Sequence, residues 1–295
     1  DRSVSRGLGD VYKRQDKVIT IDYRNRRGKM TVDKTLLIKN IQKREEMIVA
    51  YCAYTNMPLV VCDPETYNDQ IFIFDNEQLL QEFAKEYTEK KILLKGIKYP
   101  NKAFLGFFSM LYTIGVNELV FIGESSRELL ELTELVRKPD FSNLPKEQQP
   151  ISNSELQLTG LYFMQEASRP LPTEEKPQLK ELEEELAANL VKAKYIVPIE
   201  LLEGPESDTE KLKNRKYRLP ILKNKNDEMV QPIFTDPNEL AKFNRDNKFK
   251  ALAVPFSNLS KLLAKDSKGF LLNPAGFHIA MPRELLAGLA KRFEL

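Results

Sequence analysis

Apolar residues in the second half of the chain alternate between helical and extended spacing. Leu179, Leu182, Leu186 and Leu190 are three or four positions apart, which places them on one face of a helix. The run 195–201 is apolar over the length of a strand. The pattern predicts, in order, a helix over 179–194, strands over 195–201, 217–222 and 229–234, a helix that starts at Asp236-Pro237, a strand over 249–256, a helix over 258–265, extended segments over 269–274 and 277–281, and a helix over 283–293.

The first half of the chain has a similar order of elements. The pattern predicts a helix over 35–46, strands over 47–54, 58–62 and 71–74, a helix over 76–88 capped by Asp75, a strand over 91–97, a helix over 103–113, a strand over 117–123 and a helix over 126–137. Each half therefore predicts an α/β (α+β) layer with both hairpin and crossover connections, which favours a mixed sheet.

The two halves also share residues at matching positions. Phe74, Leu80 and Phe83 each have the same residue 160 positions later, in the segment 231–243. Ile48-Val49 recurs at 196–197, and the tetrapeptide Arg-Glu-Leu-Leu occurs at both 127–130 and 283–286. We therefore expect two tandem copies of one domain, a divergent copy over 16–137 and a second copy over 179–295.

A segment rich in proline and glutamate, 138–178, separates the two copies. Its composition is typical of a linker. Within it, 155–167 contains Leu156, Leu158, Leu161, Tyr162 and Phe163, a set too apolar to remain in water. We expect a helix that docks on one of the domains of this chain, with docking on a partner as the alternative.

Residues 1–15 do not resemble the start of a protein. The hexapeptide 10–15 can be encoded by the end of a transposon-based sequencing adapter, so we expect 1–15 to be translated adapter sequence. The alternative is a disordered basic tail. If 1–15 is adapter, the natural amino terminus is missing and the first domain is expected to be truncated.

Composition narrows the function classes. Hydrophobic residues make up 42% and charged residues 30% of 295 residues, which suits a folded protein of two domains. The formal net charge of +2 makes nucleic acid an unlikely partner. One His and two Cys leave little material for a metal site, and Cys52 and Cys62 are expected to be small buried apolar residues. The apolar stretch 103–122 contains Glu118, so we expect a helix and a buried strand rather than a membrane span, and a cytoplasmic protein.

The second copy resembles the SseB (enhanced serine sensitivity) family of bacteria. The resemblance depends on the segment 232–236 (Pro-Ile-Phe-Thr-Asp), on the helix from Glu239 to Phe243, and on Gly269-Phe270 followed by Asn273-Pro274, and it covers about 195–292. The first copy and the linker helix, with its segment 162–166, are similar to tandem members of the family. The family name records a phenotype and implies no established enzyme activity.

Candidate chemistry is sparse. The sequence has no glycine-rich phosphate loop, no paired-histidine metal motif and no nucleophile elbow, so we expect no catalytic residues, no cofactor and no metal. Asp236 is expected to cap a helix. The turn that contains Asn273, Pro274, Gly276 and the only histidine, His278, is a candidate recognition surface, with a purely structural turn as the alternative.

A basic run, 211–225, contains seven Lys and Arg residues and no acidic ones. It is either a patch for an acidic partner or a solvated loop, and we expect the loop. The chain is thus expected to be a non-enzymatic binding or regulatory protein for another protein or a small metabolite. The alternative is an enzyme or modulator of amino-acid (serine) metabolism, which only the family name suggests.

Overall fold

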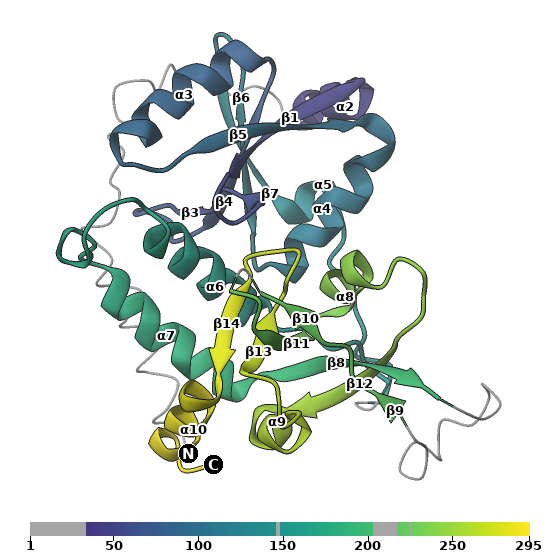
Figure 1. Ribbon diagram of the computed structural model, residues 1–295. Coiled ribbons are helices and arrows are strands. Elements are labelled where there is room, and N and C mark those ends of the chain that lie inside the picture. Colours follow the sequence, from purple (N-terminus) through teal and green to yellow (C-terminus); the bar gives the residue numbers. More distant parts are fainter. Residues whose placement is uncertain (1–33, 146–147, 203–216, 225) are drawn as a thin grey trace, which may run out of the picture. The chain divides into compact units, whose positions relative to one another are not determined.

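The computed structural model describes residues 34–145, 148–202, 217–224 and 226–295 (Figure 1). The segment 1–15 and, within the basic run 211–225, residues 211–216 and 225 lie outside the described residues. The described residues form two compact units. One consists of 34–53, 57–138 and 165–179, and the other of 54–56, 139–145, 148–164, 180–202, 217–224 and 226–295.

The first unit is built on one mixed sheet. Its strands are β1 (Glu46–Cys52), β2 (Met57–Pro58), β3 (Val61–Cys62), β4 (Asp69–Phe74), β5 (Leu94–Pro100), β6 (Glu118–Ile122) and β7 (Arg127–Glu131). Its helices are α2 (Lys34–Lys43), α3 (Glu77–Glu89), η2 (Asn101–Ala103), α4 (Phe104–Thr113) and α5 (Leu132–Leu135), with η3 (Thr173–Glu175) near its end. The long strands follow the order β5-β1-β4-β6-β7, and β2 and β3 pair with β1 and β4.

The second unit contains the remaining strands and most of the remaining helices. The strands are β8 (Lys194–Leu201), β9 (Tyr217–Arg218), β10 (Leu222–Lys223), β11 (Met229–Ile233), β12 (Lys250–Pro255), β13 (Gly269–Leu272) and β14 (Ile279–Pro282). The helices are α7 (Leu179–Lys192), α8 (Pro237–Phe243), α9 (Phe256–Leu262) and α10 (Arg283–Arg292). A further helix, α6 (Ser154–Ala167), has residues 154–164 in this unit and 165–167 in the first.

The strand pairing of the two units follows one pattern. In the first unit β1 pairs antiparallel with β5, β4 parallel with β6, and β6 antiparallel with β7. In the second, β8 pairs antiparallel with β12, β11 parallel with β13, and β13 antiparallel with β14. Ile48 opposes Phe74 in the first unit, and Ile196 opposes Phe234 in the second. The order of the long strands is the same, and so is this register, although β8 and β11 meet only at this one bridge and the described strands of the second unit form two sheets.

The core of the second unit forms around the end of β11. Ile196, Phe234 and Leu240 form a buried cluster, and Phe243 packs against it. The rings of Phe234 and Phe243 have centroids 5.4 Å apart, a distance typical of a packed aromatic pair. These residues belong to the predicted repeat, so the shared letters at 74–83 and 234–243 mark core positions.

The helix predicted over 126–137 is wrong. Residues 127–131 form strand β7, and only 132–135 are helical. In the second unit the same letters, Arg-Glu-Leu-Leu at 283–286, begin helix α10, because Pro282 ends β14 and leads into a helix. The match between the two tetrapeptides therefore aligned a strand with a helix.

Two smaller predictions also need correction. Helix α3 is capped by Asn76, whose side chain accepts a hydrogen bond from the amide of Leu79, and not by Asp75. The carboxylate of Asp75 pairs with Arg44 instead. The strands predicted over 58–62 and 217–222 are each interrupted, giving β2 with β3 and β9 with β10.

Residues 103–122 form α4 and β6, as predicted. None of the helices in the described part of the chain has both the length and the hydropathy that a membrane span requires. Both cysteines are free thiols. Cys52 is buried as predicted, but Cys62 is only half-buried, and burial raises the pKa of its thiol to about 12.

Candidate functional site

The parallel strands β11 and β13 end side by side in the second unit. In α/β sheets, ligands bind beyond the carboxyl ends of parallel strands, so the residues that follow these two strands are the first place to look for a site. Thr235 and Asp236 follow β11, and the turn 273–278 follows β13. The candidate recognition residues of the sequence therefore lie at this end of the sheet.

Asn273 connects the two strand ends. Its side-chain oxygen accepts a hydrogen bond from the main-chain amide of Thr235 at 3.0 Å, and its side-chain nitrogen donates to the hydroxyl of Thr235 at 2.9 Å. Its own main-chain amide donates to the carbonyl of Ile233 at 2.9 Å. The residue is fully buried and adopts a positive φ of 49°, a conformation that Asn tolerates better than most residues. Asn273 therefore supports the turn from inside and does not face a partner.

The other three candidates have different environments. Gly276 is buried, Pro274 is half-buried and His278 is exposed, as is Ala275 between them. The main-chain carbonyl of Asn273 accepts hydrogen bonds from the amides of Gly276 and His278, at 2.9 and 3.2 Å, which closes the turn. The exposed part of the predicted surface is thus reduced to Ala275 and His278.

Asp236 caps helix α8, as predicted. One carboxylate oxygen accepts from the amides of Asn238 and Glu239, at 2.8 and 3.1 Å. The other accepts from the hydroxyl of Thr235 at 2.7 Å and from the side-chain amide of Gln157, in α6, at 2.6 Å. Both oxygens are occupied by contacts that hold α8 and α6 in place.

From the sequence, Glu239 was expected only as part of the helix that carries the family resemblance, with no role in a site. It stands in the first turn of α8, where a glutamate is usually solvated, yet it is only 2% exposed. Burial raises the pKa of its carboxyl group, the charge of Asp236 raises it further, and the ammonium of Lys242 opposes both. One of its oxygens pairs with Lys242, whereas Oε2 has no hydrogen-bond partner in the described part of the chain.

The carboxyl group of Glu239 lies in the space that a side chain at position 276 would occupy. A Cβ atom at position 276 would lie 2.8 Å from Oε2 of Glu239, closer than a carbon and an oxygen pack. A larger residue at position 276 would thus require this buried carboxyl group to shift, whereas the φ angle at this position does not call for glycine. Only the three-dimensional structure could show this, because 37 residues separate the two positions.

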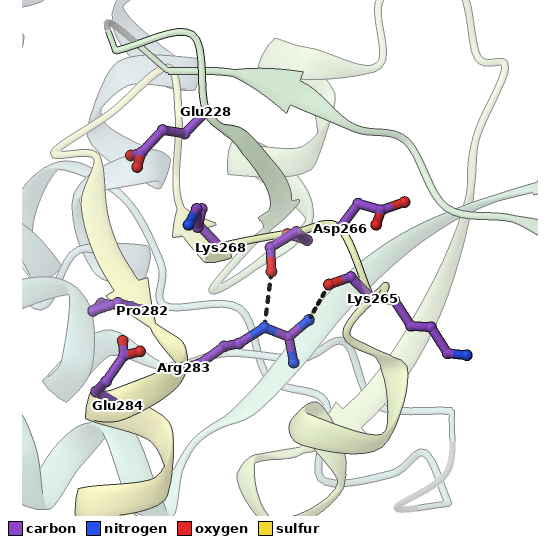
Figure 2. Close-up of a pocket in the computed structure, with 8 residues that line it drawn as sticks. Glu228, Lys265, Asp266, Lys268, Pro282, Arg283 and Glu284 are labelled. Carbon is purple, nitrogen blue, oxygen red and sulfur yellow. Dashed lines mark hydrogen bonds between the residues drawn. The ribbon is translucent and has the colours of Figure 1, made fainter.

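A hollow of about 550 Å³ lies at the opposite end of β13 (Figure 2). Its charged residues are Glu228, Lys265, Asp266, Lys268, Arg283 and Glu284. Arg283 is occupied: its guanidinium donates to the carbonyl of Ser267 at 2.9 Å, to that of Lys265 at 3.3 Å and to that of Ala264. Figure 2 shows the guanidinium of Arg283 directed at the loop that contains Lys265 and Asp266. The remaining charges are mixed, so the hollow favours no single class of ligand.

The comparisons agree with part of the sequence-based resemblance. Residues 176–288 match the model of the SseB protein N-terminal domain. The chain is thus a mixed α/β protein whose second unit carries a domain of this kind. The match does not extend to the first unit, so a second SseB domain stays a prediction.

Two solved structures show distant similarity. Anabaena Tic22 (protein transport) is 10% identical, with 80% of this chain and 92% of that chain covered and a TM-score of 0.20. Tic22 from Plasmodium falciparum is 14% identical, with 87% and 97% covered and a TM-score of 0.20. Similarity at this level supports no inference about function. No curated protein matches the sequence.

Proposed function

We propose that the chain is a non-enzymatic binding protein with two tandem SseB-like units, 16–137 and 179–295, on either side of the linker 138–178. Its partner is another protein or a small metabolite, recognised at the turn 273–278 of the second unit. The identical order and register of the long strands support the tandem arrangement.

The observation that carries the binding function is the way the turn is held. Asn273 fixes it from inside through hydrogen bonds to both strand ends, while Ala275 and His278 stay exposed above it. A turn that is ordered before binding loses little conformational entropy when a partner contacts it. The residues that could have performed acid–base chemistry here, Asp236 and Glu239, instead cap α8 and pair with Lys242.

The substitution Ala275→Arg tests this proposal. It places a long charged side chain on the exposed turn without removing a buried atom, so it should reduce partner capture by about tenfold or more, which corresponds to about 1.4 kcal/mol. Ala251→Arg is the matched control, because Ala251 is an exposed alanine of strand β12 in the same unit. Quantitative mass spectrometry of proteins and metabolites retained by each immobilised variant measures the effect.

Equal retention by the two arginine variants would contradict recognition at the turn. Turnover of serine or another amino acid by the wild-type chain would contradict the non-enzymatic part of the proposal. It would favour the alternative, an enzyme of amino-acid metabolism.

A further inference from the structure

One face of helix α6 makes specific contacts with the second unit. Asn153, just before the helix, Gln157 and Gly160 are spaced by four and three residues, so they lie on the same side of α6. This face meets the carboxyl end of β11 and the turn after β13. We call the surface beneath it, formed by Thr235, Asp236 and Phe277, the α6-binding surface.

The polar contacts of this face run from the side-chain amides of Asn153 and Gln157 to oxygen acceptors of the unit, whereas Thr159 of α6 accepts a hydrogen bond from Asn189 of α7 at 3.3 Å. The side-chain nitrogen of Asn153 donates to the carbonyls of Lys194 and Thr235, at 2.9 and 2.5 Å. That of Gln157 donates to the hydroxyl of Thr235 at 2.8 Å and to the carboxylate of Asp236 at 2.6 Å. The α6-binding surface thus presents acceptors, one of them charged, and requires donors from whatever covers it.

The third contact depends on shape. Gly160 packs against the ring of Phe277, which is fully buried, and a Cβ atom at position 160 would lie 3.0 Å from the ring. Leu156 and Leu161 of α6 are buried as well. Helix α6 thus meets this surface with two amide side chains four residues apart and a glycine three residues further on, and a larger residue in place of the glycine would require the ring of Phe277 to shift slightly.

Helix α6 lies outside the residues that match the family model, although most of it belongs to the second unit. The family match begins at residue 176, beyond the end of α6, and prolines at 150 and 170 stand on either side of the helix. The fit is also incomplete, because the side-chain oxygen of Gln157 is buried and has no hydrogen-bond partner among the described residues. An unsatisfied buried acceptor lowers the net gain from docking.

The first unit lacks this chemistry at the corresponding place. Asp75 occupies the position 160 residues before Thr235, and its carboxylate pairs with Arg44. Asn76 occupies the position before Asp236 and caps α3 through its side-chain oxygen. The acceptors at this place in the first unit are therefore engaged by residues of the first unit itself.

We propose that the α6-binding surface is a helix-recognition surface and that α6 is its built-in occupant. The external partner is a helix with Asn or Gln at two positions four apart, a glycine three residues after the second, and apolar residues between them. Such a helix takes the place of α6, so that α6 regulates access to the inner side of the turn 273–278. This inference rests on the proposed function and names the partner class for the same end of the sheet.

A labelled peptide of residues 151–166 tests the inference against the full chain by fluorescence anisotropy. In the wild type α6 occupies the surface, so the peptide can bind only the small fraction of molecules in which α6 has left. Its apparent affinity for the wild type is therefore low. In the variant Asn153→Ala/Gln157→Ala the built-in helix has lost its donors, and the peptide should bind about tenfold more tightly or better. A control peptide with the same two substitutions should not bind this variant.

Equal weak binding of both peptides to the variant would overturn the inference. If circular dichroism shows that the double variant is unfolded, the milder single variant Asn153→Ala takes its place, since Asn153 is only half-buried. Peptide binding to that variant no tighter than to the wild type would then overturn the inference. If the peptide experiment fails but Ala275→Arg still reduces partner capture, the proposed function stands and only this inference is overturned.

Discussion

Replacing Asn273 with alanine is expected to destabilise the second unit by about 3 kcal/mol, because two costs add. The buried amide of Thr235 loses its acceptor, which costs about 1–3 kcal/mol. Alanine must also adopt the positive φ of 49°, which costs about 1 kcal/mol or more. Chemical denaturation of the full chain, followed by circular dichroism, measures the free energy of unfolding of each variant.

Asn273→Gly is the control that separates the two costs. Glycine accepts a positive φ but has no amide group, so this variant should regain about 1 kcal/mol relative to alanine. His278→Ala also places alanine at a positive φ, of 45°, but removes no buried hydrogen bond, so it should cost no more than about 1 kcal/mol and less than Asn273→Ala. An alanine variant at position 273 as stable as the wild type would show that Asn273 does not hold the turn.

Replacing Gly160 with valine is expected to cost about 2 kcal/mol more than the same change at Gly288. Both glycines lie in helices, so the propensity change is the same and cancels in the comparison. At position 160 the new side chain meets the buried ring of Phe277, whereas at 288 a Cβ atom meets nothing within 4 Å. Overpacking of this kind costs about 1–3 kcal/mol.

Thermal unfolding of the two variants in parallel provides the comparison. A lower midpoint for Gly160→Val alone supports close packing of α6 on the turn. Equal midpoints would mean that Phe277 moves aside freely and that the glycine contact does not select the helix.

The local features of the second unit could be predicted from the sequence. Asp236 followed by Pro237 predicts a capped helix start, and the helix begins there. The apolar runs predicted β8, β11 and β12 to within one or two residues. The segment 155–167 was expected to be a buried helix, and its residues Leu156, Leu158 and Leu161 are buried.

Features that depend on distant residues could not be predicted. The segment 127–130 becomes a strand because β6 is available to pair with it, although the same letters begin a helix at 283–286. Asn273 was correctly placed in a turn, but its bonds to Thr235 span 38 positions, and nothing local indicates that it is buried. Nothing in the sequence indicated that Gln157 and Glu239 are buried, because polar residues on helices are usually solvated.

Amide hydrogen exchange of the wild-type chain tests the central claim most directly, namely that α6 is a replaceable occupant of the second unit. Residues that open locally exchange faster than those that require global unfolding. We predict that the amides of 157–164 exchange measurably faster than those of Gln231 and Ile233 in β11, while β11 stays protected. Equal protection of α6 and β11, with both exchanging only through global unfolding, would contradict the account, because a helix that never leaves its surface cannot be replaced by a partner.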